Sequence, residues 1–412
     1  MEGLYRLGMY ALGLLVAGAG LGCQSKPVPV LPRVAESVSP YLAPEGSTNA
    51  FDTYIRAAAR VETDDQRGLV RVSFTPDQRA ASLRRSASAV AIAARGTAQR
   101  MVYRFVPVTP LGPRPNVAGW RLIGRVMTWR AEDAGAAANY GRAIDQWAIA
   151  TKFGMDLTAG SAVEASLGWT IVDDARRAIL PYLPRMGAAQ LNRLSTVATR
   201  LIENRPDPAL AFQHEGENHR QAIQALQDAA TSGRGEELTA RLGTDAESAF
   251  RYLKNLATNR PQDLPAYFAG LGQESAQEVA EGQRRVAMPV AQRGAWPAPP
   301  TGERPWRRFA RLLFTAGRPL LEITDRSLAR TRMLALHARA LGMVKAQRRA
   351  PVTLPGSGDN IVDPYSGLEF RYQAEKADYR LYSVGSDLRD DGGETDPSGM
   401  APDLTLEDVS AR

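Results

Sequence analysis

SAVEASLGWTIVDDARRAIL (residues 161–180) and LPRMGAAQLNRL (residues 183–194) predict two successive helices. Apolar residues recur every three or four positions on one face of each segment, the spacing of an amphipathic α-helix. Pro181 and Pro184 mark a break in the helical pattern, because proline ends or kinks a helix. The two faces consist of Val163, Leu167, Ile171 and Ala175, and of Leu191, Leu194, Ala198 and Leu201. Helices of this kind predict an all-helical body.

The segments before this pair extend the helical pattern. Asn49 is a candidate N-cap for a helix over residues 49–61, because its side chain can accept a hydrogen bond from a free backbone amide. Thr75 and Gln78 have the spacing of a capping box, with Pro76 at the first helical position, and predict a helix to about residue 98. Further helices are predicted over residues 117–129 and 132–154, and strand candidates over residues 69–74 and 101–108.

The C-terminal region changes pattern. Residues 361–393 read IVDPYSGLEFRYQAEKADYRLYSVGSDLRDDGG, in which a turn at DPYSG precedes two alternating, aromatic-rich runs. Residues 368–372 and 379–384 are therefore predicted as the strands of a hairpin, which leads into an acidic, glycine-rich loop. A helix is predicted just before them, over residues 324–346.

These patterns define the expected fold class as mostly α, with a multi-helical body followed by a small α+β C-terminal subdomain of a helix, a β-hairpin and the acidic loop. The helical domain is expected over residues 47–285. A proline-rich linker over residues 286–303 separates it from the subdomain at residues 304–396. Residues 397–412 are predicted to be a disordered acidic tail.

The first 23 residues have the features of an export signal. Residues 7–22, LGMYALGLLVAGAGLG, carry no charge and follow a short region with Arg6. Sixteen residues are fewer than the ~20 that span a bilayer as a helix, and they suit the apolar core of a signal peptide. The run ends in small residues and Cys23, the only cysteine of the chain.

This ending resembles the lipobox of bacterial lipoproteins, in which the cysteine is acylated and becomes the first residue. Gly20 departs from the family, which prefers leucine three positions before the cysteine. A plain signal peptide and an uncleaved anchor are the alternatives. The resemblance implies lipidation at Cys23 and a membrane as partner. Gln24 implies, by analogy with lipoprotein sorting, a chain that faces the periplasm from the outer membrane. Residues 24–46 are rich in proline and serine and suit an extended tether.

The overall charge does not predict nucleic-acid binding. The net charge is +7 and the isoelectric point is near 9.6. The basic residues, mostly arginine, are spread along the predicted helices, and no zinc-finger spacing or RNA-binding aromatic motif accompanies them. We therefore expect no nucleic-acid partner.

Few residue patterns indicate catalysis. His214 and His219 flank Glu215 but are five positions apart, whereas a zinc-binding helix needs a spacing of four, and the segment is predicted to be a solvated helix start. Ser195 lacks the glycine neighbours of a nucleophile elbow. His337 lies among leucines and is predicted to face a helix neighbour. No phosphate-binding or dinucleotide-binding glycine motif occurs, so no catalytic residue is assigned.

The C-terminal region resembles the C-terminal part of the major pseudopilin of type II secretion. That family has a DPWG turn, a tyrosine-rich strand, LYSLGADG and a calcium loop; the counterparts here are residues 363–365 and 382–387. The resemblance implies calcium at Asp387, Asp390 and Asp391, since calcium prefers clustered carboxylate and carbonyl oxygens. A solvated acidic turn is the alternative. The prepilin site and long membrane helix of pseudopilins have no counterpart, so filament assembly is not implied.

The order of the helical segments resembles a family of uncharacterised bacterial envelope lipoproteins, which implies location but no activity. We expect a non-catalytic, membrane-anchored envelope lipoprotein that serves as a scaffold or interaction module. One alternative is an accessory component of a secretion or pilus-like system, with secretion components as protein partners. A third is a hydrolase, which would require a nucleophile and base brought together only by the fold.

Overall fold

The computed structural model describes residues 43–104, 116–232, 244–296, 306–307, 309–310, 314, 316–394 and 403–406. Within these ranges the chain forms twelve α-helices and one two-stranded antiparallel sheet near the C-terminus, which confirms the mostly α prediction. The elements are α2 (Ala50–Asp64), α3 (Gln66–Leu69), α4 (Pro76–Arg85), α5 (Ala87–Gly96), α6 (Val117–Ala136), α7 (Tyr140–Leu157), α8 (Ala162–Ile179), α9 (Ala188–Glu203), α10 (Ala209–Ser232), α12 (Thr244–Asn259), α13 (Leu264–Val286), α15 (Gly317–Gln347), β1 (Arg371–Glu375) and β2 (Asp378–Tyr382).

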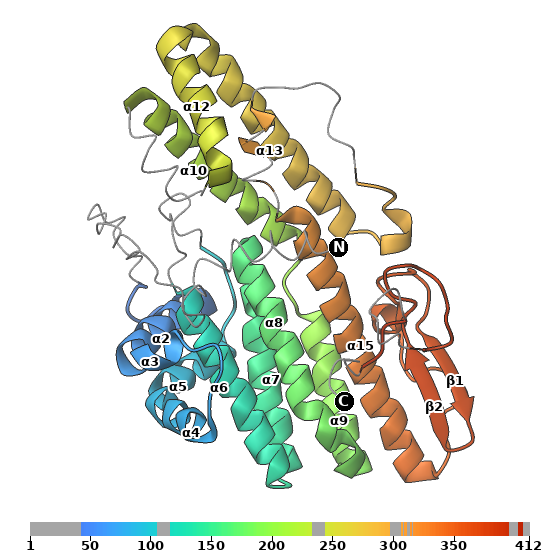
Figure 1. Ribbon diagram of the computed structural model, residues 1–412. Coiled ribbons are helices and arrows are strands. Elements are labelled where there is room, and N and C mark those ends of the chain that lie inside the picture. Colours follow the sequence, from blue (N-terminus) through green and yellow to red (C-terminus); the bar gives the residue numbers. More distant parts are fainter. Residues whose placement is uncertain are drawn as a thin grey trace, which may run out of the picture.

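A bundle of five helices forms the centre of the molecule (Figure 1). α7 packs on α6 and α8, while α15 packs on α8 and α9. The short helices α2 to α5 cover one side of this bundle, where α2 contacts both α5 and α6. The largest fully buried side chains include Trp147 on α7 and Trp169 on α8. Burial of such aromatic side chains is the main favourable term that holds the helices together.

Two glycines allow α7 and α8 to approach each other closely. A Cβ atom at Gly168 would lie 2.4 Å from the carbonyl oxygen of Gly154, and one at Gly154 would lie 2.7 Å from that of Gly168. No side chain fits at either distance, so the two backbones are in direct contact at this level. Glycine is therefore required at both positions by packing rather than by backbone conformation.

Helices α10, α12 and α13 form an arm that extends from the bundle (Figure 1). The arm has its own apolar cluster, separate from the main core, with Leu226 of α10, Leu253 of α12 and Leu271 of α13 at its centre. A third cluster joins the two parts, where Phe212 of α10 and Leu320 of α15 are buried together with Ala162 of α8. The arm is thus attached to the bundle through a small apolar junction.

The hairpin lies beside α15 (Figure 1) and pairs Arg371 with Tyr382 and Glu375 with Asp378. The first strand begins at Arg371, three residues later than predicted, because residues 368–370 still belong to the connection that follows the DPYSG turn. The main core includes Met333 of α15 and Phe370 together with residues of α2 and α6 to α9. The segment expected as a separate subdomain therefore shares its core with the helical body.

Other predictions are corrected by the structure. The helix expected over residues 75–98 is two helices, because the chain bends at Ser86, although the capping box of Thr75 and Gln78 is present. Residues 69–74 form no strand. Residues 403–406, part of the predicted disordered tail, are ordered: Leu404 pairs with Ser383, and Leu406 is buried. None of the helices in the described ranges combines the length and the apolar character of a membrane span.

Candidate functional site

Asp363 connects the two halves of the C-terminal motif. Its side chain is buried, and its Oδ1 accepts hydrogen bonds from the Tyr365 amide at 3.0 Å and from the Ser383 hydroxyl at 2.8 Å. Its Oδ2 accepts from the Ser366 hydroxyl at 3.3 Å. A buried carboxylate needs such donors to offset the loss of water. The DPYSG turn and the LYSVG segment are thus held together by one aspartate.

The same turn binds the first part of the predicted linker. The amides of Val290 and Ala291 donate to the carbonyl oxygens of Pro364 and Tyr365, at 3.0 and 2.9 Å. Gly367 has φ +74°, and a Cβ atom there would lie 2.8 Å from Pro289. The turn therefore acts as a structural joint between the linker region, the hairpin and α15, and its polar groups are used in packing.

The acidic loop follows β2, and two of its carboxylates, those of Asp387 and Asp390, have hydrogen-bond partners. Asp390 Oδ1 accepts from the Tyr382 hydroxyl at 2.9 Å and from the Gly392 amide at 3.2 Å, and its Oδ2 lies 2.8 Å from Arg371. The hydrogen bond from Tyr382, followed by that from Gly392 and the charge of Arg371, lowers the pKa of Asp390. Asp387 Oδ1 accepts from the Arg389 amide at 3.1 Å.

Asp403, which no local sequence motif marks, closes this loop. Its Oδ2 accepts from the amides of Asp391 at 3.0 Å and Gly393 at 2.7 Å, while its Oδ1 is buried without a partner. Burial raises the pKa of Asp403, while the hydrogen bonds from the two amides lower it by a smaller amount. In the sequence, the one sign of an ordered segment here is that two apolar residues, Leu404 and Leu406, follow Asp403 at alternate positions.

Asp387 and Asp390, two of the three aspartates expected to bind calcium, have other partners in the loop. A calcium ion needs oxygen atoms that converge on it. Here Arg371 forms an ion pair with Asp390, and the carboxylate that accepts the two backbone amides is that of Asp403. Nowhere in the described part of the chain do three His, Cys, Asp or Glu side chains form a group that could hold a metal ion. Calcium at Asp387, Asp390 and Asp391 therefore stays a prediction of the resemblance, without support from the loop geometry.

The HEGENH segment is not a solvated helix start, because it lies within α10, between α8 and α13. His214 Nδ1 lies 2.7 Å from the Ala159 carbonyl oxygen, and His219 Nδ1 lies 3.0 Å from the Ser275 hydroxyl. The two imidazoles thus form hydrogen bonds with different elements of the structure. Glu215 accepts from the Ala162 amide at 3.1 Å, at the start of α8. The segment connects the arm to the bundle.

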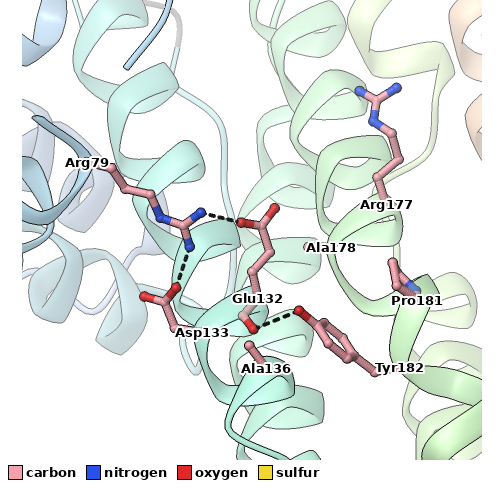
Figure 2. A pocket seen from close by; sticks show the side chains of 8 residues that line it. All are labelled: Arg79, Glu132, Asp133, Ala136, Arg177, Ala178, Pro181 and Tyr182. Atoms are coloured by element: carbon pink, nitrogen blue, oxygen red, sulfur yellow. Dashed lines mark hydrogen bonds and ion pairs between the residues drawn. The ribbon is translucent and has the colours of Figure 1, made fainter. Parts of the chain in front are cut away.

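A shallow surface pocket of about 260 Å³ lies between α6, α8 and the first turn of α4 (Figure 2). Arg79 points between Glu132 and Asp133 and contacts both carboxylates, the first at 2.8 Å. Burial raises the pKa of Glu132 in spite of Arg79. Tyr182 donates to the Glu132 carbonyl oxygen, at 3.1 Å. None of the eight residues that line the pocket is Ser, Cys, His or Lys, and both of its carboxylates are paired with Arg79.

The described residues thus define a helical protein with an arm and a C-terminal hairpin joint, in which the buried polar groups join elements to one another. Comparison with protein-family models, with curated proteins and with solved structures finds no match for the chain. Cys23 and Gln24 lie outside the described residues.

Proposed function

We propose that the chain is an exported lipoprotein of the cell envelope, anchored through Cys23 and facing the periplasm, with a non-catalytic role as a scaffold or interaction module. The observation that carries the proposal is the uncharged run over residues 7–22 that ends in small residues and the only cysteine of the chain. Gln24 supports the outer membrane as the location. The proline-rich stretch of residues 24–46 suits a tether between the anchor and the helical body.

Two features of the helical body support a scaffold rather than an enzyme. The arm of α10, α12 and α13 extends surface away from the bundle, which suits contact with a partner (Figure 1). The pocket of Figure 2 is lined by paired charges, which stabilise one another and do not activate a nucleophile.

The second candidate function is that of an accessory component of a secretion or pilus-like system. It is favoured by the hairpin and its DPYSG and LYSVG segments, which Asp363 joins into one unit. Secretion components would then be the protein partners of this unit. The order of genes around this one would separate the two candidates.

The lipid anchor is tested by metabolic labelling in a Gram-negative host. We expect the wild-type chain to incorporate radiolabelled palmitate and to partition into detergent, because acylation of Cys23 adds apolar chains. Cys23→Ala should lose both properties, and Ser25→Ala serves as the control that changes only a neighbour. Equal labelling of the wild type and Cys23→Ala would refute the anchor.

A further inference from the structure

Residues 403–406 form a short added strand at the end of the hairpin. Leu404 lies antiparallel to Ser383, the residue that follows β2. The Leu404 amide donates to the Ser383 carbonyl oxygen at 2.8 Å, and the Ser383 amide donates to the Leu404 carbonyl oxygen at 3.0 Å. The Leu404 side chain packs against the main core. Backbone pairing of this kind gives affinity for an extended chain, and the side chains beside it give specificity.

The side chains of the segment make contacts of two kinds. Asp403 is 1% exposed, and its Oδ2 accepts from the amides of Asp391 at 3.0 Å and Gly393 at 2.7 Å. Leu406 is buried with the main core, and its carbonyl oxygen accepts from the guanidinium of Arg176 on α8. The contacts therefore select an extended chain with a carboxylate at the first position and an apolar side chain at the fourth.

The groups that hold the segment are themselves held by other parts of the chain. The Ser383 hydroxyl donates to Asp363 at 2.8 Å, and Arg176 Nε lies 2.8 Å from Asp173 on the same helix. Asp390, next to the two loop amides, contacts both strands of the hairpin. None of these partners belongs to residues 403–406. We call Ser383, the amides of residues 391 and 393, and Arg176 the C-terminal site.

The segment contributes little to the core that it joins. Leu406 is its one fully buried apolar side chain, whereas the main core also includes residues of α2, α6 to α9 and α15. Local opening costs little where few apolar contacts break, so residues 403–406 can leave the C-terminal site while the bundle stays folded. The segment then acts as a ligand that is attached to its own receptor.

We propose that the C-terminal site binds an extended peptide of a partner protein, and that residues 403–406 occupy it as an intramolecular competitor. The peptide carries an aspartate with leucine, or an apolar side chain of similar size, at the first and third positions after it. It adds a strand beside Ser383, its aspartate accepts from the loop amides, and a carbonyl oxygen accepts from Arg176. This interaction goes beyond the proposed function, because it requires neither export nor acylation of Cys23.

The test measures peptide binding to the full chain. All chains carry Cys23→Ala, so the outcome does not depend on the lipid anchor. The probe is a fluorescein-labelled peptide with the sequence of residues 401–409, APDLTLEDV, and fluorescence anisotropy reports its binding. Leu406→Asp places a charge at a buried apolar position and should release the attached segment. Leu388→Asp, the same change at an exposed position of the acidic loop, is the matched control.

We expect the peptide to bind the Leu406→Asp chain more tightly than the wild-type or Leu388→Asp chain, by roughly tenfold or more, because an attached segment competes at a millimolar effective concentration. A peptide with Asp403→Ala should bind the Leu406→Asp chain roughly tenfold more weakly, because it lacks the acceptor for two amides. Equal binding of the two peptides would overturn the role of the aspartate and with it the proposal.

A chain that is cut after folding provides the second measurement. A protease site placed within residues 395–402 leaves the cut C-terminal piece held by its contacts alone. We expect the piece to be removed by dialysis without loss of the helical circular dichroism, and the labelled peptide to bind the emptied chain. If helical signal is lost with the piece, or if the emptied chain does not bind the peptide, residues 403–406 are a fixed part of the fold and the proposal is overturned. Concentration-dependent dimers of the wild-type chain would instead assign the site to the same segment of a second copy, which would overturn the partner peptide.

Discussion

A partly buried pair of polar side chains, His337 and Tyr379, connects the hairpin to the helical bundle. His337 on α15 lies with its Nδ1 2.9 Å from the Tyr379 hydroxyl of β2, and that hydroxyl donates to the His337 carbonyl oxygen at 3.1 Å. Since the hydroxyl donates to the carbonyl, we assign the Nδ1 proton to the imidazole. The sequence predicted a helix-face role for His337, and the structure identifies the strand residue that it faces.

The stability of the chain should depend on pH through His337. Burial lowers the pKa of His337 to about 4, below the ordinary value of 6.5. Its contribution is therefore fully present above pH 6.5 and is lost as pH falls towards 4, by roughly 3 kcal/mol at most. We expect the melting temperature to fall in this window, and to fall less in His337→Phe. An identical pH dependence in the two proteins would contradict this role.

The acidic loop gives a second prediction at the residue scale. A bound calcium ion would raise the melting temperature of the full chain, because it binds only the folded state. From the contacts of Asp390 with Arg371 and Tyr382, we expect millimolar calcium to leave the melting temperature unchanged. Asp403→Ala should destabilise the chain by about 1–3 kcal/mol, since it leaves two amides unpaired.

Glu394→Gln, an exposed acid of the same loop, is the control for Asp403→Ala. A calcium-dependent increase in melting temperature that Asp387→Ala removes would instead establish the ion predicted from the pseudopilin resemblance. A calcium site and a loop that binds no calcium therefore predict opposite results when the melting temperature is measured against calcium concentration.

At the scale of elements, the contact of α7 with α8 depends on the absence of a side chain. Gly168→Ala would place a methyl group 2.4 Å from the Gly154 carbonyl oxygen, so the two helices would have to separate. We expect a loss of several kcal/mol in the free energy of unfolding, as in other overpacked sites. Chemical denaturation measures this change.

Gly272 on α13 is the matched control for this substitution. A Cβ atom there meets no heavy atom within 4 Å, so Gly272→Ala should stabilise the chain by about 0.5–1 kcal/mol through helix propensity. If both alanine substitutions changed stability by the same amount, close packing would not explain Gly168.

At the scale of the whole molecule, the arm and the bundle should differ in stability. The arm buries a small apolar cluster of its own, whereas α15 shares the large core of the bundle with α8 and α9. The free energy of local opening increases with the apolar contacts that the opening breaks. We therefore expect amides in α12 and α13 to exchange with deuterium faster than those in α7 and α8. Mass spectrometry of exchanged peptides checks this. Uniform protection would show that arm and bundle unfold together.

Local sequence patterns determined most of the helices. Asn49 begins α2, and Thr75 with Gln78 caps α4, because capping involves groups within a few residues of one another. The hairpin was likewise predictable from the alternation around residues 368–384. Such features depend on neighbours along the chain, so a sequence read by itself contains them.

Only the tertiary structure decided how these elements share a core and which polar groups meet. Asp403 reaches the amides of residues 391 and 393, and Asp363 reaches Ser383, across separations that no local pattern encodes. The α15 helix packs on α9 although more than a hundred residues separate them. Burial of apolar surface is non-directional. The sequence therefore shows which face of a helix is apolar and will be buried. Which other element covers that face depends on the complete fold.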